Sequence, residues 1–272
     1  MALVKSRAIV LRTHTLGETS KVVVCYTRDY GKVRLVAKGG RKGGSRFGAA
    51  LEPMTVSGVL FYLRRERDLL LVSQAEIARE FPDLRRDVER MAFAGAVLEM
   101  TDRLLADREP DPGLFDLLEQ TLGELATVRR ERLDAALWSF AFSLASALGY
   151  GPELDRCTVC GAPPGASPAF SARLGGVVCG GCTAAGGHGE ATGRAAELVV
   201  AAARGTSESA GSVNPAVRDE VAEIVVRFLE AHTGSRLALR SLRFLAQLRR
   251  AEEADRRTRA EERGPKPASE GS

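Results

Sequence analysis

Residues 1–80 contain short runs rich in valine, leucine and isoleucine, separated by charged and glycine-containing turns. These runs predict five strands, at residues 4–13, 21–27, 32–38, 55–63 and 69–75. The third run alternates polar and apolar positions, which predicts one basic face and one buried face. Five short strands suit a small closed barrel. We therefore predict a five-stranded OB-fold over residues 1–80, although an SH3-like barrel fits the strand count almost as well.

From residue 81 onward, apolar residues recur at three- and four-residue spacing, which predicts helices. The predicted helices span residues 88–105, 114–128, 133–148, 194–204, 216–232 and 237–262. Asn214-Pro215 is a suitable helix start, and Gly234 a suitable stop. The pattern thus predicts an α+β chain in which a helical domain, residues 81–262, follows the barrel. Residues 263–272 are rich in proline, glycine and serine, and we expect a disordered tail there.

Four of the five cysteines form the pattern Cys157-x2-Cys160-x18-Cys179-x2-Cys182. Each pair forms a tight knuckle, and two knuckles supply the tetrahedral sulfur set that suits one structural Zn²⁺ ion. An iron–sulfur cluster is an alternative, but the spacing is not the usual ferredoxin one. Four sulfur ligands leave no open position for a reactive water, so we predict no catalysis at this metal. The fifth cysteine, Cys25, lies in a predicted strand and is most simply a buried apolar residue.

The segment around the knuckles, residues 151–193, is inserted between predicted helices. It is rich in glycine, proline and alanine and has few large apolar side chains. Such a segment buries too little apolar surface to order itself. We therefore expect metal binding to supply its folding energy.

Composition excludes a fibrous or wholly disordered chain, because 44% of the residues are apolar and 27% are charged. The N-terminus lacks the long apolar region of a secretory signal. The uncharged stretch at residues 135–152 is 18 residues long but contains serines, glycines and a proline. We interpret it as a buried core helix rather than a membrane span, and predict a cytoplasmic protein.

Charge is distributed unevenly along the chain. Residues 1–46 hold 11 Lys/Arg and two acidic residues, a net charge of +9, whereas the rest of the chain has a net charge of −5. This asymmetry predicts that the N-terminal part binds a polyanion. The glycine-rich connection at residues 39–50 should form a mobile cationic loop, and it lacks the lysine of a Walker phosphate loop. We expect the cations of this loop to contact phosphates. Tyr26, Tyr30 and Phe47 are candidates for base stacking. For Tyr26, packing in the core is the simpler role.

Several short motifs follow one another along the barrel: Gly17-Glu18-x-Ser20, Thr27-x3-Gly31-x-Val33, Lys38-Gly39-x-Arg41, Ser45-Arg46 and Leu51-x-Pro53. Leu71 and Ala75-Glu76 follow them, and Ser241-Leu242-Arg243-Phe244 lies near the C-terminus. Together with the late cysteine pairs, this order resembles the RecO family of bacterial recombinational repair proteins. The similarity spans about residues 1–248 and is most specific between Lys38 and Arg46.

The resemblance implies an OB-fold, a helical domain that often holds a four-cysteine zinc site, and no enzymatic activity. RecO proteins bind single- and double-stranded DNA and anneal complementary strands. With RecR they help to load RecA onto DNA coated by single-strand binding protein, whose acidic tail they contact. The implied location is the cytoplasm, at the nucleoid. The implied DNA-binding residues are Lys21, Arg34, Lys38, Arg41, Lys42 and Arg46, and the implied zinc ligands are Cys157, Cys160, Cys179 and Cys182.

Some predictions stay open at this stage. Arg129, Arg130 and Arg132 form a cationic corner that could accept the acidic tail, but a solvated turn explains them equally well. A zinc-ribbon transcription or RNA-binding factor is the alternative function, although Arg173 is the only Lys or Arg between residues 157 and 193. No motif predicts an enzyme, because the three histidines lack recognisable nucleophile or carboxylate partners.

Overall fold

The computed structural model describes residues 2–43, 45–64, 66–186, 188–206, 213–247 and 250–251. Its N-terminal part is a closed barrel with the strand order β1-β2-β3-β5-β4. The strands are β1 (Ala2–Leu16), β2 (Ser20–Thr27), β3 (Gly31–Ala37), β4 (Val56–Leu63) and β5 (Leu69–Arg79). Only the β3–β5 pairing is parallel among these described strands. The barrel confirms the predicted five-stranded OB-fold.

The barrel interior is filled by inward-facing side chains from all five strands, among them Val10, Leu35 and Phe61. The short 3₁₀ helix η1 (Gly48–Leu51) closes the barrel from the β3–β4 connection. Phe47 precedes η1 and is buried in this core, so its assignment as a base-stacking residue is wrong. Tyr30 packs edge-on against Phe61, with ring centroids 5.5 Å apart.

The helical part begins with α1 (Pro82–Arg86), α2 (Val88–Leu104), α3 (Pro112–Thr127), η2 (Arg130–Arg132) and α4 (Leu133–Ala147), and continues with α6 (Gly193–Ala203) and α7 (Pro215–Thr233). Asp87 and Asp111 begin α2 and α3, because each carboxylate accepts hydrogen bonds from two backbone amides of the first turn. A further helix covers residues 240–247, starting three residues later than predicted. The predicted C-terminal half of that helix and the predicted tail lie mostly outside the described residues.

The barrel and the helices share one core. Ile9, Leu11, Val24 and Tyr26 point out of the barrel and pack into the same apolar cluster as Phe115 of α3. The α2–α3 connection also pairs with β3, and its Glu109 carbonyl oxygen would lie 2.4 Å from a Cβ at position 31. Only glycine fits there, and Gly31 also adopts a positive φ of 64°. The two parts therefore pack as one body.

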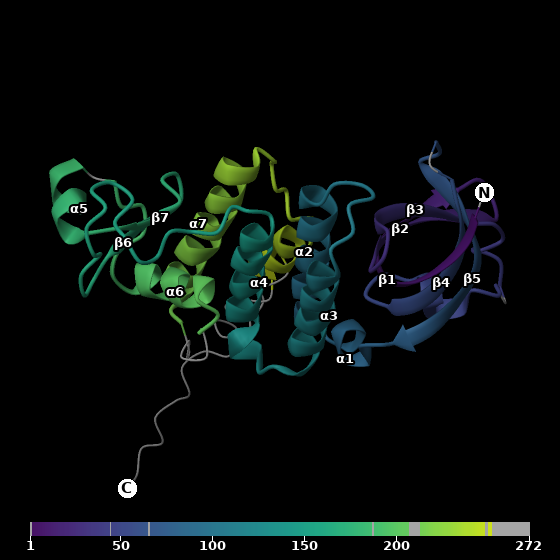
Figure 1. Ribbon diagram of the computed structural model, residues 1–272. Coiled ribbons are helices and arrows are strands. Elements are labelled where there is room, and N and C mark those ends of the chain that lie inside the picture. The colour runs from purple at the N-terminus through teal and green to yellow at the C-terminus, as the bar shows by residue number, and fades with distance from the viewer. Residues whose placement is uncertain are drawn as a thin grey trace, which may run out of the picture.

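The segment with the four cysteines lies at the opposite end of the helices from the barrel (Figure 1). It contains the short hairpin β6 (Ala169–Ser171) and β7 (Gly176–Val178), followed by α5 (Gly180–Gly186). Phe170 of β6 inserts between Phe142 of α4 and Phe228 of α7, with centroid distances of 6.1 Å to each. The segment is thus anchored by apolar burial at its base, which sequence composition did not predict.

No helix in the described ranges combines the length and the apolar character needed to cross a bilayer. The uncharged stretch considered above forms most of α4, most of whose residues are buried in the shared core.

Candidate metal site and nucleic-acid interface

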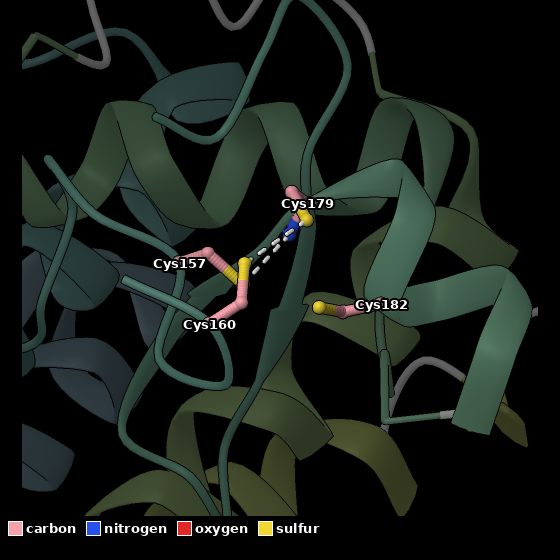
Figure 2. A group of neighbouring side chains, drawn as sticks. All are labelled: Cys157, Cys160, Cys179 and Cys182. Carbon is pink, nitrogen blue, oxygen red and sulfur yellow. Dashed lines mark hydrogen bonds between the residues drawn. The ribbon is translucent and has the colours of Figure 1, made fainter. Parts of the chain in front are cut away.

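The four predicted metal ligands come together in space. Figure 2 shows Cys157 and Cys160 on one knuckle, Cys179 directly after β7, and Cys182 in α5. All four sulfur atoms lie within 4.8 Å of one another. The Sγ atoms of Cys160 and Cys179 are 3.8 Å apart. A tetrahedron with Zn–S bonds of about 2.3 Å has sulfurs about 3.8 Å apart. This group can hold a metal ion.

Backbone geometry builds the first knuckle. The Cys157 amide donates to the Ala162 carbonyl oxygen at 2.8 Å, and the Gly161 amide donates to the Cys157 carbonyl oxygen at 2.8 Å. These bonds fold the turn so that both thiols of the pair face β7. Gly161 has a φ of 73°, a conformation that favours glycine.

The electrostatics of the cluster favour a bound cation. The Cys179 amide donates to Cys157 Sγ at 3.3 Å and, with the Cys160 amide, lowers the Cys157 pKa to about 6. The Cys160 and Cys179 sulfurs, together with desolvation, raise the Cys182 pKa to about 12. Four thiolates therefore do not coexist here without a positive charge between them. A divalent ion with soft-ligand preference fits this donor set.

Little else holds the knuckles in place. The small apolar cluster beside them contains Cys157, Ala169 and Val178 as its buried members. Their side chains bury too little area to order two knuckles, which supports the expectation that metal binding stabilises this end of the segment.

The predicted DNA-binding residues do not all lie in one place. Lys38, Arg41, Lys42 and Arg46 are exposed on the β3–η1 connection, which we call the cationic loop (residues 38–46). Arg41 donates to the carbonyl oxygens of Gly17 and Glu18 at 3.0 Å each, which ties the loop to the β1–β2 hairpin. The Arg46 guanidinium stacks over the Phe47 ring at 4.8 Å. Within the described ranges, Lys38 and Lys42 make no ion pair.

Lys21 is buried and does not join this surface. Its Nζ donates to the Leu51 carbonyl oxygen at 3.0 Å and to Glu52 Oε1 at 2.6 Å. Its charge therefore fixes η1 against β2 and is balanced inside the fold. We leave Lys21 out of the proposed interface.

Arg34 is half-exposed and lies at the junction between the barrel and α2 rather than on the loop. Its guanidinium pairs with Asp107 at 2.5 Å. This pairing leaves only part of its charge available to a ligand.

The other N-terminal cations explain the uneven charge of the chain in a second way. Arg7 pairs with Glu119 at 2.8 Å, and Arg12 pairs with Asp102 at 2.5 Å. Arg28 pairs with Asp116. The ammonium group of the buried Lys32 donates to the Asp102 backbone carbonyl oxygen at 2.6 Å. It also lies within 4 Å of the Asp102 and Asp107 carboxylates. These carboxylates belong to α2, α3 and the connection between them.

Much of the excess positive charge is therefore neutralised by the helices and is not displayed to solvent. The opposite net charges of the N-terminal segment and the rest of the chain indicate that such ion pairs can form. They do not indicate which residues pair, because the paired residues are 70 or more positions apart in the sequence. No local motif identifies them.

Two family models match this chain: Recombination protein O N terminal over residues 1–81 and Recombination protein O C terminal over residues 85–243. The chain belongs to the RecO family. Curated relatives agree with this assignment. DNA repair protein RecO of Anaeromyxobacter dehalogenans (strain 2CP-C) is 39% identical over 257 residues, which is 91% of this chain and 98% of the relative.

Two further RecO proteins match more than half of the chain. The protein of Pelotomaculum thermopropionicum is 41% identical over 184 residues, which is 68% of this chain and 70% of the relative. The protein of Cutibacterium acnes is 38% identical over 187 residues, which is 67% of this chain and 75% of the relative. All three are named as DNA repair proteins, so a role in DNA repair is supported for this RecO-family chain.

The cationic corner of this RecO-family chain is partly neutralised. Arg130 pairs with Asp87 at 2.7 Å, and Arg129 pairs with Glu131 at 3.5 Å. The corner therefore has less charge to offer an acidic tail than the sequence indicates.

Removing the Asp102 carboxylate is expected to destabilise the RecO-family fold by about 3 kcal/mol, because Asp102→Ala removes the carboxylate that pairs with Arg12 at 2.5 Å and leaves the buried Lys32 ammonium with Asp107 as its remaining carboxylate partner. Urea unfolding curves would measure the loss. Glu223→Ala is the matched control, since it removes only an exposed i,i+4 pair with Arg227 and should cost about 0.5 kcal/mol or less. Equal losses in the two variants would contradict the buried role of Asp102.

Proposed function

We propose that this RecO-family chain is a DNA-binding recombination mediator that acts by binding and positioning strands, without bond chemistry. The observation that supports this most directly is the cationic loop. Its four cations lie on one exposed connection of an OB-fold, and within the described ranges none of them pairs with a carboxylate, whereas other N-terminal cations such as Arg7, Arg12 and Arg28 do. Exposed cations of this kind bind nucleic-acid phosphates by releasing counterions.

Several features favour non-specific contacts with the phosphate backbone over base recognition. The aromatic side chains considered for stacking contribute little: Phe47 is buried, and Tyr26 is buried against the α2–α3 connection, where its hydroxyl accepts from the Asp111 amide at 3.1 Å. The remaining contacts come from long, flexible Lys and Arg side chains. Such contacts carry no sequence information, so we expect similar affinities for oligonucleotides of different sequence.

Strand annealing follows from the same charges. Two complementary strands repel each other, and cations on an exposed loop reduce this repulsion when both strands lie close to it. Contacts that read only the backbone let one strand slide along the other until the bases are in register. We therefore propose that the chain binds both single- and double-stranded DNA and speeds annealing.

The metal in this proposal is one structural Zn²⁺ held by Cys157, Cys160, Cys179 and Cys182. The sulfur geometry supports a bound cation, and four thiolate ligands are typical of structural zinc. When bound, the ion cross-links the two knuckles. The chain's own contribution is to hold Cys157 as a thiolate through backbone amide donors.

Partners are proposed from the family assignment. We propose that the chain works with RecR to load RecA onto DNA coated by single-strand binding protein, and that it contacts the tail of that protein. The contact surfaces for these partners are not assigned.

A salt titration tests the proposed function. Binding of a fluorescent single-stranded oligonucleotide should weaken as salt rises, with a slope of log K against log salt of about −3 if four phosphates are contacted. In parallel, annealing of two complementary oligonucleotides should be faster with the protein than without it. Absence of binding even at low salt would overturn the proposal, as would binding that does not change with salt.

The alternative, a zinc-ribbon factor that reads nucleic acid through the knuckles, has weaker support. The cysteine segment lies at the end of the helices away from the barrel (Figure 1), and Arg173 is the only cation between residues 157 and 193. An Arg173→Gln variant with strongly reduced affinity would favour this alternative.

A further inference from the structure

A cleft of about 620 Å³ lies where the barrel meets the helices. One wall is formed by β1 and β3, and the opposite wall by α2 and the start of the helix at residues 240–247. The connection between η1 and β4 contributes Pro53 and Met54 to the lining. The cleft is therefore built from both parts of the chain.

The charged side chains that line this cleft are mostly cationic. They include Arg12, Lys32, Arg34, Arg103 and Arg240, against two acidic residues, Glu99 and Asp102. The three barrel cations already pair with carboxylates. In contrast, Arg103 and Arg240 are exposed, and neither makes a side-chain ion pair within the described ranges. These two helical arginines are the cations of the cleft that are available to a ligand.

The acidic residue nearest to Arg240 is already engaged by backbone groups. Glu99 of α2 accepts from the Arg240 amide at 2.6 Å and from the Ser241 amide and hydroxyl at 3.2 and 2.7 Å. These bonds cap the helix at residues 240–247 and fix its start against α2. Glu99 thereby positions Arg240 at the rim of the cleft.

The cleft is continuous with the cationic loop across one face of the barrel. Successive side chains on a strand alternate between faces, so Arg34 and Val36 share one face of β3, and Lys38 follows directly after the end of that strand. On β1, Arg12 and His14 line the cleft. Leu16 lies on the same face of β1, next to the β1–β2 turn, where Arg41 donates a hydrogen bond to the Gly17 carbonyl oxygen. The exposed face between cleft and loop holds His14, Val22 and Val36, which lie side by side across three strands.

We propose that this cleft binds the phosphate backbone of the same single strand that the cationic loop holds, with Arg103 and Arg240 as its phosphate-contacting residues. This inference rests on the proposed function and extends it: the strand crosses from the barrel onto the helices. The loop supplies one end of the site, the face of β1, β2 and β3 supports the middle, and the two helical arginines hold the other end.

The test compares salt dependence in three variants of the full chain with a fluorescent single-stranded oligonucleotide. Arg103→Gln combined with Arg240→Gln should reduce the magnitude of the salt slope by about 1.4 and weaken binding roughly 25-fold at about 0.1 M salt, because two phosphate contacts are lost. Arg103→Lys combined with Arg240→Lys keeps both charges and should keep most of the slope. Arg173→Gln removes an exposed charge near the knuckles and should change neither quantity.

The outcomes separate this inference from the proposed function. If binding of the unmodified chain weakens with salt and the double glutamine variant keeps the same slope, the cleft proposal is overturned while the loop proposal stands. If the lysine variant loses affinity as much as the glutamine variant, charge is not what the cleft supplies, and the proposal is also overturned. If the unmodified chain does not bind, the proposed function fails first. Circular dichroism and thermal unfolding of each variant show that the fold is intact.

Discussion

Replacing Lys38, Arg41, Lys42 and Arg46 together by glutamine is expected to weaken single-stranded DNA binding roughly 500-fold at about 0.1 M salt. Each phosphate contact with a single strand contributes about 0.7 to the salt slope, so the loss of four contacts removes nearly three logarithmic units at that concentration. The fold should survive, because the four side chains are exposed. Arg41 alone has backbone partners, and these are replaceable by water.

Fluorescence anisotropy at several salt concentrations would measure this effect. The matched control replaces four exposed arginines far from the loop, Arg156, Arg173, Arg194 and Arg204, by glutamine, which changes the net charge by the same amount. Strong weakening in the loop variant with little change in the control would show that the loop is the site. Similar weakening in both would mean that overall charge, and not the loop, determines the affinity.

Loss of the proposed zinc ion is expected to unfold the knuckles while leaving the barrel folded. Structural zinc contributes about 10–16 kcal/mol of apparent binding energy in small zinc domains, and the apolar cluster beside these cysteines is too small to replace it. Cys182→Ser should therefore lower the bound metal from about one ion per chain towards zero. Hydrogen exchange should become fast in the peptides around both knuckles.

The anchoring of Phe170 limits how far this unfolding spreads. Because Phe170 packs between α4 and α7, we expect peptides from those helices and from the barrel to keep their protection. Cys25→Ala is the control, since Cys25 is buried in the barrel far from the cluster and should leave the metal content unchanged. A Cys182→Ser protein that retains a full equivalent of metal would contradict the assigned ligand set.

Patterns that repeat locally were sufficient to predict most of the fold. Strand alternation and helical spacing are set by neighbours in sequence, and the barrel and the main helices appear near the predicted positions. The cysteine site could also be predicted from the sequence, because the two cysteines of each pair are only three residues apart. The chemistry of thiolate ligands then narrows the choice of metal.

The interface was harder to predict, because what matters there is which charges remain unpaired. Lys21 and Lys38 look alike in sequence, yet Glu52 neutralises the first and no described carboxylate neutralises the second. Arg103 and Arg240 lie 137 positions apart in the sequence and share a cleft only because Glu99 fixes one helix against another. Long-range pairing of this kind leaves no periodic signal.

The carboxylates of α2 and α3 have a practical consequence for dissecting this protein. A fragment cut after residue 80 would lack the carboxylates of Asp102, Asp107, Asp116 and Glu119. The barrel cations that pair with these carboxylates in the intact chain would then be unpaired. It would also expose the apolar side chains of Ile9 and Tyr26, which the helices bury in the intact chain. The unpaired cations of such a fragment would bind any polyanion non-specifically, so affinities measured on it would overstate those of the intact chain.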